Sequence, residues 1–421
     1  MKIFKFGGAS VKDAAAVQNV KSIVEQYKND NLIIVISAMG KTTNAMEMIV
    51  KALYDKDWHT FTETIAERRA YHMEIMTSLF PAKHHPIYKD INNIFDEILS
   101  LKEEITPDNY DFQYDQIVPL GELASSKIVA AYLAGQGMNV CWRDAKRFIR
   151  TNQKYRSAEV DWIKTQELTD IELKKHDCNI SITQGFIGHT EEGFTTTLGR
   201  EGSDFTAAIM AYCTNAESVT IWKDVPGMLN ADPKFFANTV KLDKISFKEA
   251  IELAYYGASV IHPKTIKPLQ NKNIPLYIKS FLNPSAEGSV IQQSTDNDNL
   301  VPSFIFKMNQ VLVSITPKDF SFVVEENLSD IFKKLAEVGV HINLMQNSAV
   351  SFTVCIDADD RKLNRLMEIL KSDYIVKYND NVELVTIRHY DQSTIERTTK
   401  EREILMEQKT RQTVRIVMVN K

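Results

Sequence analysis

Cysteine, excess basic charge and long apolar runs are all in short supply in this chain. The four scattered cysteines, Cys141, Cys178, Cys213 and Cys355, include no Cys-x-x-Cys pair. This spacing argues against a disulfide framework or a cysteine-based zinc site, and it predicts a reducing, cytoplasmic location. Fifty Lys and Arg residues face 55 Asp and Glu, and this net charge of −5 leaves no basic surplus for binding nucleic acid or an anionic membrane.

Membrane insertion and export are also not expected. The apolar run Leu32–Met39 is far shorter than the roughly 20 residues of a membrane-spanning helix. The first residues lack the apolar region of a signal peptide. The composition, with 44% hydrophobic and 25% charged residues, is that of an ordinary globular protein.

Glycine is scarce as well, and its distribution divides the chain. Fourteen of the 15 glycines lie at or before Gly288, and only Gly339 follows. Glycine is needed where backbone closely approaches a ligand or takes a positive φ, so we expect ligand chemistry in the first 290 residues. Turn-forming residues are concentrated between 283 and 302. We therefore predict a ligand-binding domain at 1–290 and a second domain at 300–421.

Hydrophobic periodicity predicts a different fold class for each domain. In the first, strands expected at 2–6, 32–37, 179–184 and 218–223 alternate with helices, including 58–80, 87–101 and 248–256. Alternation of this kind is typical of an α/β domain with a largely parallel sheet flanked by helices. Ligands of such sheets bind beyond the carboxyl ends of the strands.

The second domain reads as a ferredoxin-like unit. Strands are expected at 311–316, 320–324, 340–344, 351–356 and 382–388, with helices at 329–338 and 361–372. A further helix at 394–408 and a strand at 413–419 suggest half of a second unit, apparently truncated.

The turn after the first strand, Lys5-Phe6-Gly7-Gly8, could bind phosphate. Two glycines let backbone N–H groups close on phosphate oxygens, and Lys5 adds a positive charge. The alternative is an ordinary tight turn with a surface lysine. The second strand exit, Ser37 to Asn44, is not a P-loop because Val35 stands where that motif requires glycine. It could still bind a ligand, or simply cap a helix.

The segment from Thr195 to Asp204 is the most informative. Arg200 lies between two glycines and could bind a carboxylate or phosphate. Ser203 or Asp204 could cap the next helix, and Asp204 could also accept hydrogen bonds from a lysine or coordinate Mg²⁺. The alternative is a capped surface helix with a solvated arginine.

Two further loops offer polar groups. The exit after 218–223, from Trp222 to Pro233, could hold a base and ribose, or it could be only a Pro-Gly turn. Glu122 opens a helix, where a carboxylate usually complements the helix dipole but could instead bind an ammonium group.

Taken together, these motifs resemble the aspartate kinases. The resemblance rests on Lys5-Phe-Gly-Gly-Ala-Ser, Ser37 to Asn44, Leu120-Gly-Glu122, Thr197 to Asp204, Trp222 to Gly227 and Gly257 to Pro263, which occur in that order. It implies an amino-acid-kinase domain followed by ACT-type (ferredoxin-like) regulatory repeats. It also implies phosphorylation of the β-carboxylate of L-aspartate by ATP with Mg²⁺, for lysine, threonine and methionine biosynthesis. A homodimer through the ACT-type region and an amino-acid effector are further implications.

The resemblance assigns roles residue by residue. Lys5 and Asp204 match catalytic positions. Substrate-binding positions match Ser37, Thr43, Glu122, Phe186, Arg200 and Ser203. Nucleotide-binding positions match Lys5, Phe6, Gly7, Gly8, Lys223, Asp224, Leu229, Lys234 and Ser259. No metal-ligating protein residue is expected, and no catalytic base is needed because a carboxylate is already nucleophilic.

The chain also departs from the family pattern. Ser259 stands where relatives commonly carry a lysine that contacts ATP phosphates, a role that Lys264 or Lys279 could take over. Leu229 replaces a common tyrosine, and Lys234 replaces a common arginine. Asn343 replaces a common aspartate, which predicts weak or absent inhibition by lysine. The alternatives to an active aspartate kinase are another amino-acid kinase and a weakly active regulatory paralogue.

Overall fold

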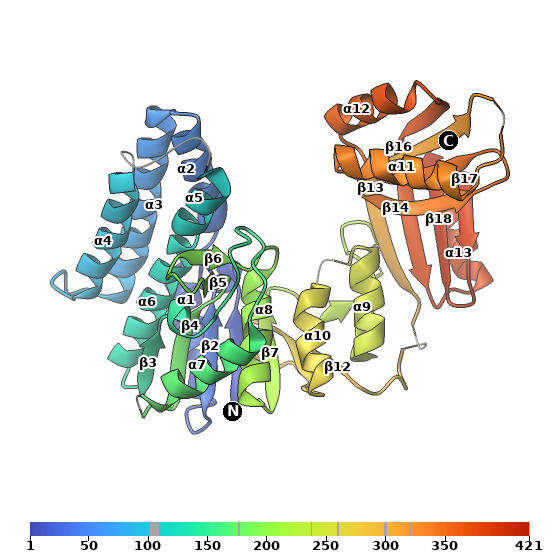
Figure 1. The fold of residues 1–421 in the computed structure, drawn as a ribbon. Helices are drawn as coiled ribbons and strands as arrows, with labels where there is room; N and C mark the ends of the chain where they lie inside the picture. The colour runs from blue at the N-terminus through green and yellow to red at the C-terminus, as the bar shows by residue number, and fades with distance from the viewer. Residues whose placement is uncertain are drawn as a thin grey trace. The chain divides into compact units, whose positions relative to one another are not determined.

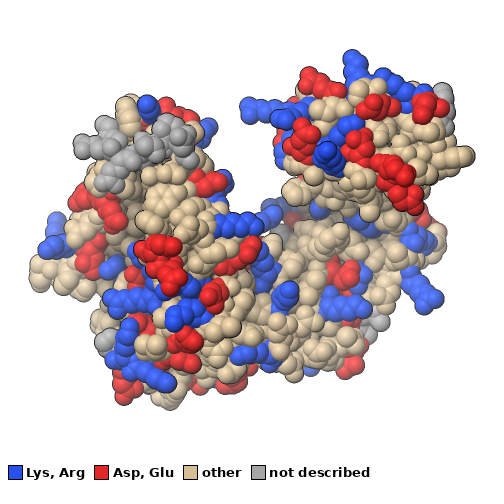
Figure 2. All heavy atoms as spheres, in the orientation of Figure 1, with Lys and Arg blue, Asp and Glu red and all other residues tan. Residues whose placement is uncertain are grey.

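The computed structural model describes residues 1–421 except 102–108, 176, 237, 259–260, 299–300, 320 and 421 (Figure 1). The chain forms two compact units. Unit 1 comprises Met1–Met228, Lys241–Ile251 and Val260–Thr295; unit 2 comprises Leu229–Val240, Glu252–Ser259 and Asp296–Lys421. Acidic and basic side chains are interspersed over the face shown in Figure 2. That mixture agrees with the small net charge of the sequence.

Unit 1 is built on an eight-stranded sheet in the order β10-β12-β11-β7-β1-β2-β4-β3. The strands are β1 (Lys2–Phe6), β2 (Leu32–Ile36), β3 (Val140–Arg143), β4 (Ile180–Gln184), β7 (Ser218–Lys223), β10 (Lys244–Ser246), β11 (Leu276–Ser280) and β12 (Ser289–Gln292). Neighbours run parallel except β11 and β12, which pair antiparallel. All five residues of β2 are buried, as expected of a strand covered on both faces by helices. The predicted α/β fold is confirmed.

Helices lie between these strands along the chain. They are α1 (Ala14–Glu25), α2 (Thr42–Tyr54), α3 (Trp58–Leu79), α4 (Ile87–Ser100), α5 (Tyr110–Ile117), α6 (Leu120–Gly135), α7 (Trp162–Lys174), α8 (Gly202–Thr214), α9 (Phe247–Tyr256) and α10 (Pro263–Asn271). The predicted helices at 58–80 and 87–101 correspond to α3 and α4. The predicted helix at 248–256 corresponds to α9, and the Ser246 hydroxyl caps its start by accepting a hydrogen bond from the Glu249 N–H at 3.0 Å.

One helical stretch in the described chain, Tyr110–Gly135, is long and apolar enough to cross a bilayer. Its apolar window is 78% buried inside the structure, as is common for a core helix of a globular domain. The stretch contains α5, a short turn and α6. It packs inside unit 1 and supports one wall of the cavity described below.

Unit 2 contains a six-stranded antiparallel sheet in the order β14-β15-β13-β16-β18-β17. Its elements are β13 (Ser303–Pro317), α11 (Glu325–Val338), β14 (Ile342–Asn347), β15 (Phe352–Asp357), α12 (Asp360–Leu370), β16 (Tyr374–Arg388), α13 (Gln392–Thr399), β17 (Arg402–Lys409) and β18 (Thr413–Asn420). The run from β13 to β16 is the predicted βαββαβ unit. The strand expected at 320–324 is wrong, since residues 321–324 are irregular and residue 320 lies outside the described part.

The last predicted helix is also too long. It ends at Thr399, and Arg402–Lys409 forms β17, which pairs with β18. Glu, Leu, Met, Gln and Lys favour helices intrinsically, but pairing with a neighbouring strand overrides that preference here. Two strands therefore follow α13, where the sequence had suggested one.

Both central strands of unit 2 continue beyond the first βαββαβ unit. Ser303–Lys307 of β13 pairs with the end of β16, which in turn pairs with β18. A register shift lies between Lys307 and Gln310. The second half of the sheet therefore contains four strand segments, and α13 packs against it in the same core cluster.

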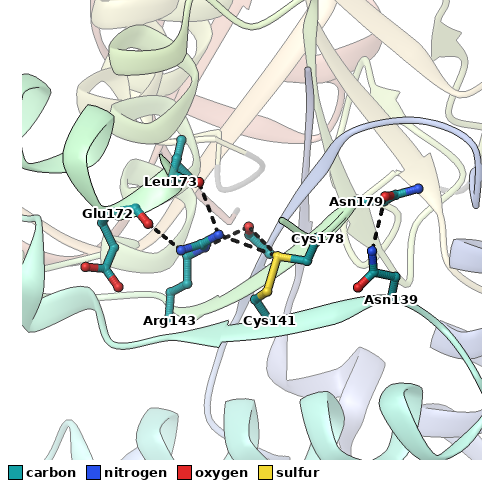
Figure 3. Close-up of a disulfide and its surroundings, with 8 residues drawn as sticks. Asn139, Cys141, Arg143, Glu172, Leu173, Cys178 and Asn179 are labelled. Atoms are coloured by element: carbon teal, nitrogen blue, oxygen red, sulfur yellow. Dashed lines mark hydrogen bonds between the residues drawn. A yellow bond between two sulfur atoms is a disulfide. The ribbon is translucent and has the colours of Figure 1, made fainter. Parts of the chain in front are cut away.

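The cysteines require a correction. Cys141 and Cys178 form a disulfide, with Cα atoms 6.0 Å apart (Figure 3). The two residues are 37 positions apart in sequence, but β3 and β4 are parallel neighbours and Cys178 lies two residues before the start of β4. Sequence spacing could not reveal this pairing because it is created by the sheet. The cysteine-based argument for a reducing compartment loses its basis, while Cys213 and Cys355 are free and buried.

Reduction of the Cys141–Cys178 bond is expected to lower the free energy of unfolding by about 2–4 kcal/mol, because it frees a long loop in the unfolded chain. Urea unfolding with and without dithiothreitol measures this change, and the double variant Cys141→Ser/Cys178→Ser should be insensitive to the reductant. Titration of free thiols in denaturant should find the two of Cys213 and Cys355. Finding all four cysteines as thiols in the oxidised protein would contradict the pairing.

Candidate active site

A cavity of about 570 Å³ lies in unit 1 at the carboxyl ends of β1, β2 and β7. These strands are parallel neighbours, so the loops that follow them meet at one edge of the sheet. The cavity is lined by Lys5, Gly8, Ser37, Ala38, Gly40, Thr43, Glu47, Tyr114, Glu122, Arg156, Phe186, Gly199, Arg200, Glu201, Gly202, Ser203, Asp204 and Lys223. Ten residues singled out from the sequence are among them.

Two glycines allow the first two strand exits to pack together. A Cβ atom on Gly8 would lie only 2.8 Å from the carbonyl oxygens of Ala38 and Gly40. The Gly40 N–H donates to the Gly8 carbonyl at 3.0 Å, and Gly40 itself has a φ of 57°. A side chain on Gly8 would force these backbones apart. The glycine pair is therefore needed for a close approach of two loops at the rim of the cavity.

Asp204 lies between Lys5 and Lys223 in the cavity wall, and we call these three residues the cationic pole. Asp204 is only 2% exposed and lies in the first turn of α8. Its oxygens lie 2.7 Å from Lys5 Nζ and 3.4 Å from Lys223 Nζ. Burial alone would raise the pKa of Asp204, but the two ammonium groups hold it below its usual value. The three groups together carry a net charge of +1, which suits a site for a phosphoryl group.

A second buried carboxyl group lies at the start of α6. Glu122 is 3% exposed, and its Oε2 atom has no hydrogen-bond partner in the described part of the chain. Burial raises the pKa of Glu122 to about 8, although the Ala38 N–H, Lys5 and the Thr43 hydroxyl act in the opposite direction. An unpartnered buried carboxyl oxygen in a cavity is suited to receive a cationic group.

Arg200 provides a third charged group. It is exposed on the loop before α8, between Gly199 (φ 77°) and Glu201 (φ 53°). With the described residues it forms no hydrogen bond or ion pair, so its guanidinium is available to an anion. Phe186 packs against the start of α8, directly after this loop. Its N–H donates to Thr206 Oγ1 at 2.9 Å, and a Cβ on Gly202 would lie 2.6 Å from its ring.

Several residues proposed for the nucleotide do not line this cavity. Phe6 is fully buried and stacks on Trp222 with ring centroids 6.0 Å apart, so it supports the loop from the core. Gly7 precedes the short 3₁₀ helix that begins at Gly8. Asp224 is exposed after β7. Leu229 and Lys234 belong to unit 2, and Ser259 lies outside the described residues.

The two lysines expected to compensate for Ser259 also make other contacts. Lys264 Nζ lies 3.4 Å from the Ser157 hydroxyl, and Lys279 Nζ lies 5.5 Å from the centre of the Trp222 ring. Neither lines the cavity. Their participation in nucleotide binding stays a prediction.

Sequence reasoning missed three polar side chains of the cavity wall. Tyr114 donates its hydroxyl to Glu47 at 2.6 Å, and the Arg156 guanidinium lies 4.6 Å from the centre of the Tyr114 ring. Glu47 follows Thr43 by four residues on α2, so helical spacing could have found it. Tyr114 and Arg156 are brought to the cavity by tertiary contacts that carry no local signal.

Comparison with known proteins agrees with this geometry. Residues 1–280 match the amino acid kinase family. The chain is 31% identical over 356 residues to lysine-sensitive aspartokinase 3 of Escherichia coli (strain K12), covering 84% of this chain and 78% of the relative. It is 28% identical to the chloroplastic bifunctional aspartokinase/homoserine dehydrogenase 1 of Arabidopsis thaliana, of which it spans 42%.

Two solved structures of Escherichia coli aspartokinase III share the fold. One is a complex with aspartate and ADP (R-state), and the other is a complex with lysine and aspartate (T-state). Each is 27% identical to this chain, and each superposes on 99% of it with a TM-score of 0.82. The matched region makes up 96% of the chain in the R-state structure and 95% of the chain in the T-state structure. The chain therefore belongs to the amino acid kinase family and, within it, to the aspartokinases.

Proposed function

We propose that this chain transfers the γ-phosphoryl group of ATP to the β-carboxylate of L-aspartate and forms 4-phospho-L-aspartate. The observation that carries the proposal is the arrangement of charge in one cavity. A cationic pole built from Lys5, Asp204 and Lys223 lies in the same cavity as Glu122 and Arg200. Among the described residues, the buried Oε2 atom of Glu122 has no hydrogen-bond partner and the Arg200 guanidinium forms no ion pair. L-aspartate carries the three complementary charges.

Each charged group of the amino acid has a counterpart. The ammonium group pairs with Glu122, whose Oε2 atom has no hydrogen-bond partner among the residues that the structure describes. The α-carboxylate pairs with Arg200, since guanidinium groups bind carboxylates through two parallel hydrogen bonds. The hydroxyl groups of Ser37, Thr43 and Ser203 supply neutral hydrogen bonds, and Phe186 supplies an apolar surface. The β-carboxylate is then directed toward the Lys5 pole.

The nucleotide phosphates fit the other side of the cavity. Lys5 and Lys223 supply positive charge for the phosphates, and Gly8 allows the first two strand exits to pack together at the rim of the cavity. Among the described residues no cluster of three His, Cys, Asp or Glu side chains could hold a metal. Mg²⁺ is therefore proposed to arrive with ATP, bound mainly by phosphate oxygens, where it neutralises charge in the transferring group.

The reaction needs positioning and charge stabilisation more than covalent catalysis. An oxygen of the β-carboxylate attacks the γ-phosphorus, the bond to the bridging oxygen breaks, and ADP leaves with that electron pair. Lys5 and Lys223 stabilise the negative charge of the transferring group, and Asp204 keeps both lysines in place. The β-carboxylate of aspartate is already ionised, so the reaction requires no general base to deprotonate it.

Assembly and regulation belong to unit 2 in this proposal. The strands β14 and β17 form the edges of its antiparallel sheet, and an edge with unpaired backbone groups can join a second sheet. We propose a homodimer through this region, with an amino-acid effector bound there. A cytoplasmic location stays a prediction from the sequence.

The catalytic assignment predicts different effects of replacing Lys5 and Lys2, two lysines on β1, on the rate of the reaction. Purified protein with ATP, Mg²⁺ and L-aspartate should yield an acyl phosphate that hydroxylamine traps as a hydroxamate. Lys5→Met should lower kcat by about 100- to 1,000-fold, the usual cost of removing one transition-state donor. Lys2→Met, on the same strand but paired with Asp30, should keep its activity. Absence of hydroxamate from the unmodified protein would refute the proposed reaction.

Replacement of Glu122 should separate stability from function. The pKa of Glu122 rises from about 4.5 in the unfolded chain to about 8 in the fold, so its contribution to stability is lost as pH rises through 8. Glu122→Gln should therefore gain stability over the parent protein by up to about 1.4 kcal/mol for each pH unit between these values. Urea unfolding at pH 5 and pH 9 measures the gain, and the KM for aspartate should rise sharply. If the variant and the parent protein differed in free energy of unfolding by the same amount at pH 5 and at pH 9, the raised pKa of Glu122 would be contradicted.

Lysine is expected to inhibit weakly or not at all. The Asn343 side chain is neutral; it donates to Gln310 and Asp357 at 2.7 and 2.8 Å and accepts from Lys307 Nζ at 2.7 Å. It therefore offers no free carboxylate to a ligand amine. Inhibition curves for lysine should show little effect, and Asn343→Asp should increase sensitivity. Strong inhibition of the parent protein by micromolar lysine would overturn this expectation.

A further inference from the structure

Arg156 reaches the cavity from a loop to which neither the motifs nor the catalytic proposal assign a role. It lies on the irregular segment before α7 and lines the same cavity as Arg200 and Glu122. Its backbone is left-handed, with a φ of 64°. A residue with a Cβ atom rarely adopts this conformation, and such residues persist where the surroundings fix them, often at ligand sites.

A buried carboxylate fixes the Arg156 backbone. Both oxygens of Asp115 accept the Arg156 N–H, at 3.1 and 3.0 Å. The same carboxylate accepts the N–H and the hydroxyl of Thr197, at 2.8 and 2.7 Å. Asp115 is fully buried on α5, so it joins that helix, the Arg156 loop and β6 (Thr195–Thr197). The loop is therefore held at a defined place in the cavity wall.

The Arg156 side chain is held more loosely than its backbone. Its guanidinium lies 3.1 Å from Asp111 and 4.6 Å from the centre of the Tyr114 ring. The arginine and aspartate side chains of this ion pair are 48% and 61% exposed, so water weakens it. The ring contact keeps the cation beside the cavity without neutralising it. An anion in the cavity can therefore compete with Asp111 for this guanidinium.

The neighbours of Arg156 place it near the amino-acid end of the cavity. A Cβ on Gly199 would lie 3.2 Å from the Arg156 carbonyl oxygen, so the Arg156 loop packs against the loop that carries Arg200. On the other side, Tyr114 is bonded to Glu47, which lies one helical turn beyond Thr43 on α2. Thr43 in turn contacts Glu122. A row of neighbouring polar residues thus connects Glu122, the proposed partner of the ammonium group, with Tyr114, Arg156 and the loop of Arg200.

We propose that Arg156 is a specificity-determining residue that adds a second guanidinium to the α-carboxylate of the substrate, beside Arg200. This inference rests on the proposed aspartate kinase reaction. Two guanidinium groups on one carboxylate strengthen discrimination against amino-acid analogues that lack that charge, because a charged hydrogen bond loses most of its strength when its partner is neutral. The β-carboxylate, which reacts, remains with Lys5.

The test compares L-aspartate with its α-amide, which keeps the reacting β-carboxylate but replaces the α-carboxylate by a neutral group. Arg156→Gly removes the guanidinium and relieves the left-handed backbone, so the variant should fold with an unchanged or higher Tm. Its kcat/KM for L-aspartate should fall about 10- to 100-fold, mainly through KM, which corresponds to one charged hydrogen bond. Its kcat/KM for the α-amide and its KM for ATP should change less than about threefold.

Two further variants complete the design. Arg156→Lys should restore part of the affinity for L-aspartate, because it returns the charge without the planar fork. Lys154→Ala is the matched control: it removes an exposed cation from the same loop, where Lys154 pairs with Glu159 at 3.3 Å and does not line the cavity. The control should leave all kinetic constants unchanged.

The outcomes separate this inference from the proposed reaction. If the parent protein forms hydroxamate from L-aspartate but Arg156→Gly keeps its KM, or loses the same factor for both substrates, the role of Arg156 is refuted and the reaction stands. If the parent protein forms no hydroxamate, both fail. A selective loss for L-aspartate, with partial recovery in Arg156→Lys, supports the assignment.

Discussion

The active site depends on one ion cluster, the buried carboxylate of Asp204 between Lys5 and Lys223. Two lysines this close would repel each other, and a buried carboxylate alone would take up a proton. Together they remain charged, and they join the exits of β1 and β7 to the start of α8. The parallel sheet makes this possible, because it brings three distant segments to one edge. The remaining cavity groups are arranged around this fixed positive charge.

The fold could be predicted where local sequence and tertiary environment agree. The β2 segment is apolar throughout and is buried on both faces, and α4 buries the apolar stripe that its periodicity indicates. Prediction failed where pairing between distant segments decided the structure. Arg402–Lys409 has the composition of a helix but pairs with β18, and Cys141 meets Cys178 only because β3 and β4 are neighbours.

The candidate site shows the same division. The glycines and the lysine at the end of β1 identified Lys5 and Gly8, since parallel strands gather their carboxyl ends. The glycines around Arg200 and the start of the next helix identified Arg200 and Asp204. No such sequence feature identified Tyr114 or Arg156. Arg156 enters the cavity wall only because the buried carboxylate of Asp115, far away in sequence, holds its N–H. Long-range support of this kind cannot be read from spacing along the chain.

The long strands β13 and β16 have a mechanical consequence for unit 2. Each has 15 residues, which at about 3.3 Å per residue gives a length of roughly 50 Å. Each contributes one end to the first βαββαβ unit and the other end to the strands beside β18. The two halves of the sheet share these strands, so the same backbone runs from one half into the other, with a register shift between Lys307 and Gln310. A signal received at one end of the sheet can thus travel through continuous backbone rather than across a packed interface.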